Sequence, residues 1–237
     1  MGSPADDSER LSKEGGAREH PDLLLSVERG PDVEQTRLIA RDVAAKLELG
    51  PTDDLLDVGC GSGLLLSIRR ERCRSVFGVD FAASQLALGR KHFPDIPFAS
   101  ASAEALPFPE ARFSRILCYG VWHYVDNWRD TLDGFLAVLR RPGIILIGDI
   151  PSRRHRWRLY LQYAKRLPAL AIHPRTFLKK LKYSQETSHW HWVDLDQMVS
   201  HLEGRGGRGE ILPQPKGHRQ YGGVTHVYRF DLKIRVG

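Results

Sequence analysis

The stretch Leu55-Leu56-Asp57-Val58-Gly59-Cys60-Gly61-Ser62-Gly63 is a short apolar run followed by glycines at alternate positions. A second apolar run, residues 75–80, ends in Asp80. Only a backbone without side chains turns so tightly while it lies against a ligand. The stretch therefore predicts a small-molecule cofactor at the end of the first strand.

The spacing of these glycines distinguishes between cofactors. The dinucleotide fingerprint G-x-G-x-x-G would need a glycine where this chain has Leu64, so the spacing argues against a dinucleotide. A glycine triplet alone would also fit an ordinary tight turn. Because Asp57 precedes the triplet and Asp80 ends the next apolar run, we favour a binding site over a simple turn.

The pattern Asp57-x-Gly59-x-Gly61-x-Gly63, with an acid at the end of the next strand, resembles the class I S-adenosylmethionine (SAM) dependent methyltransferases. The resemblance covers residues 32–150 and, more loosely, the last forty residues. It implies an α/β fold with a doubly wound, mostly parallel seven-stranded sheet. The C-terminal end of the chain is then expected to form an antiparallel hairpin, and a helical cap insertion is expected before it.

Hydrophobic periodicity and turn residues place strands and helices in alternation, with short connections, which favours a parallel sheet covered by helices on both faces. Helices are predicted over 32–49, 64–72, 84–93, 131–139 and 194–203. Strands are predicted over 54–58, 75–80, 96–101, 113–119, 144–148, 209–212 and 224–236, with a turn at 141–143. Such sheets bind ligands at the carboxyl ends of their strands.

A chain of 237 residues suits one domain. Residues 1–20 are polar, lack the pattern of a secretory signal and predict a disordered tail, whereas 21–50 predict an N-terminal helix or lid. Residues 51–237 predict the methyltransferase domain, with a basic and aromatic insertion at 151–192 over the site. The absence of an apolar run of ~20 residues predicts a soluble protein. Three cysteines at unrelated spacings favour the cytoplasm.

The resemblance assigns cofactor contacts to the glycine stretch and the strand after it. Asp57 would face the amino group of the methionine moiety, and the backbone from Gly59 through Cys60 and Gly61 to Gly63 would approach that moiety closely. Asp80 would accept hydrogen bonds from the ribose diol, although an acid there could instead cap the next helix. Phe81 would offer an apolar face to adenine, or else pack in the core.

Two further segments extend the expected cofactor site. Ser102, Ala103 and Glu104 begin a segment that resembles Asp-Ala-x-x-Leu-Pro-Phe, which lines the adenine pocket in the family. Ser102 replaces the usual Asp, so we expect a slightly weaker hold on the cofactor. The resemblance places Cys118 beside the sulfonium. We interpret Cys118 as a packing residue rather than a nucleophile, because apolar residues surround it.

His123 is the candidate catalytic residue. A hydroxyl acceptor must lose its proton during methyl transfer, and an imidazole that titrates near neutrality can take it. The alternative is that His123 packs against the following helix. The other histidines lack partners at the spacing of metal ligands, and the pair His189 and His191 lacks a third ligand, so we predict no metal.

The expected activity is SAM-dependent methyl transfer to an oxygen or nitrogen of a small-molecule or glycan acceptor. A net charge of +6 and the basic insertion favour an anionic acceptor and leave peripheral membrane contact open. Two alternatives remain: a SAM-binding protein without catalysis, and an RNA methyltransferase that uses the insertion. Nucleic acid is not favoured, because the insertion carries no RNA-binding motif. The sequence does not determine the oligomeric state.

Overall fold

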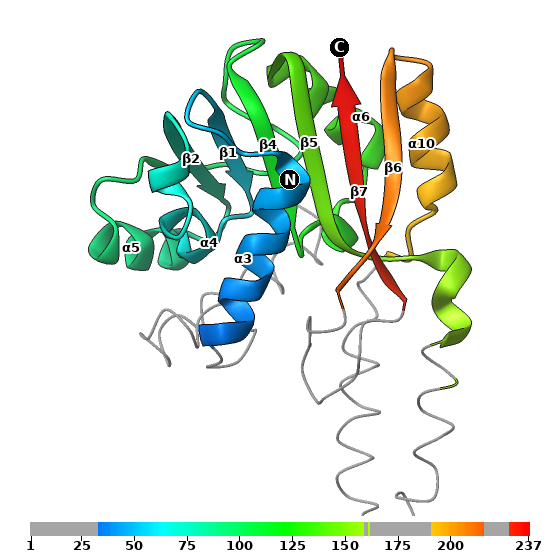
Figure 1. Cartoon of the computed structure of the whole chain (residues 1–237), viewed down its shortest axis with the longest axis horizontal. Helices are drawn as coiled ribbons and strands as arrows, with labels where there is room; N and C mark the ends of the chain where they lie inside the picture. Colours follow the sequence, from blue (N-terminus) through cyan, green and yellow to red (C-terminus); the bar gives the residue numbers. More distant parts are fainter. Residues whose placement is uncertain (1–32, 159–160, 162–190, 216–227) are drawn as a thin grey trace, which may run out of the picture.

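A central sheet of seven strands, in the order β3-β2-β1-β4-β5-β7-β6, organises the molecule (Figure 1). The computed structural model describes residues 33–158, 161, 191–215 and 228–237. The tail at 1–20 and most of the 151–192 insertion therefore lie outside the described residues. The strands are β1 (Asp54–Val58), β2 (Ser75–Asp80), β3 (Phe98–Ser100), β4 (Phe113–Tyr119), β5 (Leu139–Pro151), β6 (Gly207–Pro213) and β7 (Arg229–Val236).

The pairing of the strands confirms the predicted mostly parallel sheet with an antiparallel end. The pairs β1–β2, β1–β4, β2–β3 and β4–β5 are parallel. In contrast, β7 is antiparallel to both β5 and β6. Five parallel strands thus end at the same edge, which is the edge where such sheets bind ligands.

Helices cover both faces of the sheet. One face packs against α3 (Val33–Leu47), α4 (Leu64–Ser67) and α5 (Ala83–His92), and the other against α6 (Trp128–Val138) and α10 (Leu195–Glu203). The period of two in the strands produces this arrangement. In β1, for example, Leu55 belongs to the hydrophobic cluster under α3, whereas Leu56 belongs to the cluster under α6. Both side chains are fully buried.

Several predicted elements differ in extent from those observed. The predicted helix at 64–72 is interrupted, because α4 ends at Ser67 and a separate 3-10 turn, η1, spans Arg70–Arg72. The predicted turn at 141–143 lies inside β5, which runs from Leu139 to Pro151. Between the pairs Phe113–Leu139 and Arg115–Ile144 the register of β4 and β5 shifts, so the extra residues of β5 form a bulge that accommodates a proline.

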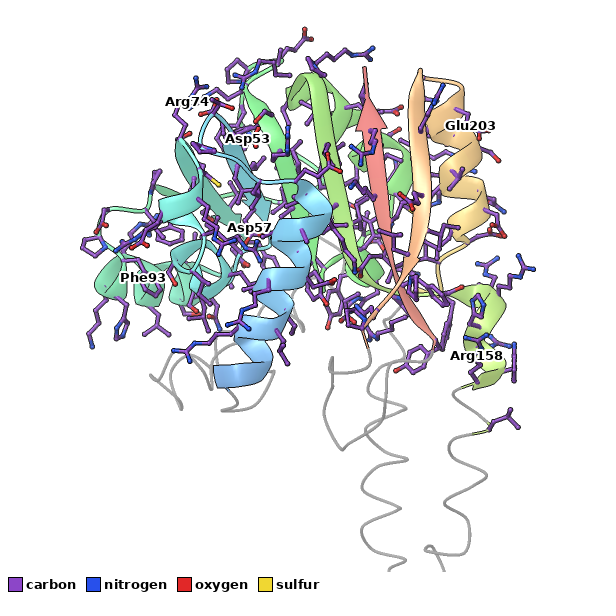
Figure 2. All side chains as sticks on the ribbon, viewed as in Figure 1. Asp53, Asp57, Arg74, Phe93, Arg158 and Glu203 are labelled. Atoms are coloured by element: carbon purple, nitrogen blue, oxygen red, sulfur yellow. The ribbon has the colours of Figure 1, made fainter. Side chains whose placement is uncertain are left out.

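Figure 2 distinguishes the two edges of the parallel strands. Asp53 and Arg74 lie at the upper, amino edge, and Arg158 lies below the opposite, carboxyl edge. Across the described ranges, 33–158, 161, 191–215 and 228–237, no helix has both the length and the apolar character needed to cross a bilayer.

The amino edge is held by a buried carboxylate, Asp54, whose side chain is 3% exposed. Its oxygens accept hydrogen bonds from Arg74, from Ser75 at 2.6 Å and from Arg140 at 3.1 Å. The hydrogen bonds from Arg74 outweigh burial and hold the pKa of Asp54 well below its usual range. This cluster joins the starts of β1, β2 and β5 and has a structural role.

The depressed pKa of Asp54 predicts how stability depends on pH. As the pH falls, the aspartates of the unfolded chain become protonated at about pH 4, whereas Asp54 of the folded chain becomes protonated only at a lower pH. The contribution of Asp54 is therefore complete above that pH and decreases as the pH falls below it. Chemical denaturation should show that Asp54→Asn lowers the free energy of unfolding at pH 7 by about 1.5–3 kcal/mol and flattens its decline below pH 4.

Asp95→Asn is the matched control, because Asp95 pairs with Arg70 at the surface and its side chain is 65% exposed. We expect a change within about 0.5 kcal/mol. Equal losses in the two variants would contradict a specific role for Asp54.

Candidate functional site

Gly59 and Gly61, two of the three glycines after β1, have different surroundings. Gly59 has φ 74°, and a Cβ there would lie 2.1 Å from Val121 Cγ2. The sequence assigned Gly59 to cofactor contact, but the space beside it is filled by the turn after β4. Gly61 also has a positive φ, 56°, yet the nearest atom to a Cβ would be Gln85 Oε1 at 3.9 Å. The backbone at Gly61 therefore has room for a ligand beside it.

Asp80, at the end of β2, holds the glycine turn in place. Its Oδ2 accepts a hydrogen bond from the Gly61 N–H at 2.7 Å, and its Oδ1 accepts one from the Ala82 N–H at 2.9 Å. Ala82 is the N-cap of α5 and no side-chain hydrogen bond caps that helix, so Asp80 forms a turn before the helix and is not its N-cap. A carboxylate has about four lone-pair sites, which leaves capacity for the ribose hydroxyls.

Asp57 is the next-to-last residue of β1 and lies on the face that α3 covers (Figure 2). It is 2% exposed, and its charge acts on Cys60 and on the buried Arg69. Burial lowers the pKa of Arg69 to about 10, although Asp57 opposes this shift. Burial, together with Asp57 and Asp80, raises the pKa of Cys60, so its thiol stays protonated.

The predicted adenine segment is anchored from within the chain. The Glu104 N–H donates to Ser102 Oγ at 3.2 Å, which forms a local turn. Glu104 Oε1 accepts hydrogen bonds from the N–H groups of Asp126 and Asn127, at 2.9 and 3.1 Å. Glu104 thereby joins this segment to the start of α6. Ala103 packs against the hydrophobic core, and Phe81 is half-buried next to Asp80.

The end of β4 leads directly to His123. Cys118 is fully buried in the hydrophobic cluster under α6, which agrees with packing rather than nucleophilic chemistry. Gly120 then turns the chain, and η2 (Trp122–Tyr124) carries His123, which is 3% exposed. The rings of His123 and Tyr124 are 4.1 Å apart between centroids. His123 therefore lies at the carboxyl edge and is also packed there.

Both ends of the insertion meet beside this turn. The His191 N–H donates to the His123 carbonyl oxygen at 2.9 Å, and the Val193 N–H donates to the Pro151 carbonyl oxygen at 2.9 Å. The Arg153 N–H in turn donates to the Val193 carbonyl oxygen at 2.8 Å. The chain thus leaves β5 and returns at the carboxyl edge, beside the turn that carries His123.

Two histidine side chains each lie within hydrogen-bond distance of a carboxylate. His191 Nε2 lies 2.9 Å from Asp126 Oδ1, and His201 Nε2 lies 2.9 Å from Asp133 Oδ1. Within the part of the chain that the structure describes, no group of three or more metal-ligating side chains comes together. His189 lies outside the described residues, so the expectation of no metal stays a prediction.

A second polar group at the carboxyl edge was missed by the sequence analysis. Its members, from the ends of β4 and β5, the residue after β6 and the start of β7, are Tyr119, Asp149, Gln214, Arg229 and Asp231. The available signals were an acid directly after the most apolar strand and two charges at the start of the last strand. Neither signal indicates that the residues meet.

Comparison with known proteins agrees with this geometry. Residues 56–147 match the model of the methyltransferase domain family. The chain is 26% identical over 178 residues to a demethylmenaquinone methyltransferase of Paenarthrobacter aurescens, covering 73% of this chain and 69% of the relative. It is 34% identical over 125 residues to a ubiquinone/menaquinone biosynthesis C-methyltransferase of Geobacter sulfurreducens, covering 48% of each chain.

Among solved structures, a SAM-dependent methyltransferase from Aquifex aeolicus matches with a TM-score of 0.58 and 11% identity, covering 94% of this chain and 98% of the other. Taken with the match to the methyltransferase family over residues 56–147, the fold and the glycine turn support a class I SAM-dependent methyltransferase. Its cofactor is SAM. The space at Gly61 and the acids Asp57 and Asp80 fit that cofactor.

The cofactor assignment predicts that Gly61→Val abolishes binding of S-adenosylhomocysteine, the demethylated product. The valine side chain would project into the space beside the turn. Isothermal calorimetry should give the unaltered chain a Kd in roughly the micromolar range. Gly206→Val is the control, because Gly206 also has a positive φ, 74°, with no atom within 4 Å of an added Cβ. Both variants carry backbone strain, but only Gly61→Val should lose binding; equal binding by the two would refute the assignment.

Proposed function

We propose that this enzyme transfers the methyl group of SAM to an oxygen of a small-molecule acceptor, with His123 accepting the proton of the acceptor hydroxyl. The observation that supports this proposal is the position of His123. It lies on the turn after β4, whose Val121 contacts Gly59 of the glycine turn, and its backbone binds the returning end of the insertion. The glycine turn, the turn that carries His123 and the returning end of the insertion therefore lie side by side.

Each residue of the site would have a separate role in binding or catalysis. Bound SAM supplies an electrophilic methyl group on its sulfonium. Asp57 would orient the amino group of the methionine moiety, and Asp80 would hold the ribose while it keeps the Gly61 amide in place. The segment from Ser102 to Glu104, tied to α6, would border adenine. His123 would increase the nucleophilicity of the acceptor by removing its proton as the methyl group is transferred.

The names of the similar relatives favour a small molecule over RNA. Those relatives are named for demethylmenaquinone and for C-methylation, which raises a second candidate: methylation of a ring carbon of a reduced quinone. A reduced quinone carries phenolic hydroxyls, and loss of a phenolic proton also makes the adjacent ring carbon nucleophilic. The same base at His123 would serve either acceptor atom, so the product identifies which reaction occurs.

The positive charge at the start of the insertion, residues 151–158, supports an acceptor with negative charge. Arg153, Arg154 and Arg156 are exposed where the insertion begins, and the side chain of Arg154 is 78% exposed. The same arginines affect His155: burial first, and then the positive charges of Arg158 and Arg154, lower the pKa of its imidazole. A phosphate or carboxylate on the acceptor, including one on a glycan, would be attracted to this face.

His123 can be tested directly with labelled SAM. His123→Ala should lower the turnover of a hydroxyl acceptor by a factor of about 100 to 10,000 and leave the affinity for S-adenosylhomocysteine unchanged. His92→Ala, at the exposed end of α5, is the control and should have no effect on either quantity. A parallel loss of cofactor affinity or of melting temperature in His123→Ala would instead show a packing role.

The cap prediction uses a triple variant. Replacing Arg154, Arg156 and Arg158 with alanine should raise the apparent KM of the acceptor and leave cofactor binding unchanged. Methyl transfer from labelled SAM can be measured over a dilution series of a metabolite extract from the source organism. The matched control replaces Arg70, Arg72 and Arg141, which are exposed and lie away from the carboxyl edge. Equal acceptor kinetics in the two triple variants would rule out this role for the insertion.

A further inference from the structure

Three oxygen atoms at the carboxyl edge converge on one nitrogen. Gln214 Nε2 lies 3.1 Å from Tyr119 Oη, 3.2 Å from Asp149 Oδ1 and 3.2 Å from Asp231 Oδ1. A carboxamide nitrogen carries two hydrogens, so the three oxygens share two donors. The convergence also determines the orientation of the amide, because only the nitrogen can face these oxygens.

Asp149 is held in an uncommon backbone conformation, with φ 62°. Its N–H donates to Asp231 Oδ1 at 2.9 Å, and its carbonyl oxygen accepts from Arg229 Nη1 at 2.7 Å. Arg229 also pairs with the Asp149 carboxylate at 2.9 Å. A left-handed residue other than glycine costs on the order of 1–3 kcal/mol. Two side chains, Asp231 at 0% and Arg229 at 1% exposure, stabilise this conformation from β7.

A contribution to folding stability does not account for the buried charges in this cluster. Asp231 binds Lys46 of α3 at 2.6 Å, and Lys46 also pairs with Asp42, so five charged groups, three acidic and two basic, are gathered here largely out of water. Burial of ion pairs has a desolvation cost that often equals or exceeds their attraction, and apolar residues of the same size serve stability as well. Strain and buried charge together at one place are typical of binding sites.

The second observation is an unsatisfied polar atom. Gln214 Oε1 is buried, and in the described ranges it has no hydrogen-bond partner. Buried carbonyl oxygens nearly always accept a hydrogen bond. With the nitrogen bound to the three oxygens, this oxygen is directed to receive a donor that the described residues do not supply.

The cluster lies at the same end of the sheet as His123. Tyr119 ends β4, immediately before the turn that carries His123, and it pairs with Gly148 of β5. A Cβ at Gly148 would lie 2.2 Å from the Tyr119 ring, so the phenol lies across the end of β5. Burial disfavours the charged guanidinium, yet Asp149, Tyr228 and Tyr124 raise the pKa of Arg229. Tyr124, next to His123, is thus an electrostatic neighbour of the cluster.

We propose that Gln214, Asp149 and Tyr119 form an acceptor subsite for a hydroxyl or amino group, with Gln214 Oε1 accepting its hydrogen bond. Arg229 and Asp231 are positioning residues that hold Asp149 in place. The inference rests on the proposed function, because it assigns the polar group of the same acceptor a position across from His123. An acceptor that lacks a hydrogen-bond donor at this place would leave buried polar atoms unpaired and would be rejected.

Gln214→Met tests the subsite, since methionine keeps the length of the side chain and removes its hydrogen bonds. With tritium-labelled SAM, a dilution series of the metabolite extract and 1,4-naphthalenediol as a defined phenolic probe, we expect the apparent KM of the labelled acceptor to rise at least tenfold. The affinity for S-adenosylhomocysteine should stay within twofold. Gln197→Met is the matched control, because Gln197 lies on α10 and bonds Asp194 at the surface. It should change neither quantity.

Asp149→Asn provides an independent arm, because asparagine tolerates a positive φ and preserves the shape of the side chain. It should raise the acceptor KM and leave the affinity for S-adenosylhomocysteine within twofold, while the melting temperature falls because the buried Arg229 loses a charge partner. Unchanged acceptor kinetics in both variants, with an active unaltered chain, would overturn the subsite alone. Loss of cofactor affinity in parallel with KM would also overturn it in favour of a structural role. An unaltered chain that labels no acceptor would overturn the proposed function and the subsite together.

Discussion

Burial of both faces of the sheet is the constraint on which the rest of the structure depends. Ile145 and Ile147 of β5 point into the cluster under α6, whereas Ile144 and Leu146 point into the cluster under α3. With both faces covered, polar groups on the strands reach ligand or solvent only at the strand ends. The two edges then have different roles: the amino edge carries the Asp54 cluster, and the carboxyl edge carries the site.

At the carboxyl edge, residues that would contact ligands also hold the backbone. Asp80 binds the amides of Gly61 and Ala82, so the carboxylate expected to hold the ribose also determines the shape of the glycine turn. Glu104 similarly binds two amides at the start of α6. Such dual use makes the site rigid before a ligand arrives, which lowers the entropic cost of binding. It also means that substitutions at these positions change conformation together with ligand contact.

Much of the fold could be predicted from local pattern. The strands at 54–58, 75–80 and 113–119 were predicted with their observed bounds, because each is a short, mostly apolar run between turn residues. The glycine turn and Asp80 were identified as a pair for the same reason, since both follow strands that end at one edge. The elements that were misjudged contain features with a non-local cause. β5 continues through Pro142 because β4 pairs with it both before that residue, at Leu139, and after it, from Ile144 onward.

The polar cluster around Gln214 could not have been predicted in this way. Tyr119 and Gln214 are 95 positions apart, and Asp149 and Arg229 are 80 apart. Nothing local indicates that a tyrosine at the end of one strand and a glutamine after another will share a hydrogen bond. The antiparallel return of β7 between β5 and β6 brings them together, and this pairing is a property of the whole sheet.

The amino-acid sequence by itself determined the alternating apolar strands and amphipathic helices, the glycine turn and the acid two elements later, because each depends on residues close together in the chain. Those features are enough for the class of fold and for SAM as the cofactor. Only the tertiary structure decided that Val121 fills the space beside Gly59, that Cys118 is enclosed in the core, and that both ends of the insertion meet beside the turn that carries His123. These depend on which strands become neighbours, and that choice minimises exposed apolar surface over the entire domain rather than within any one segment.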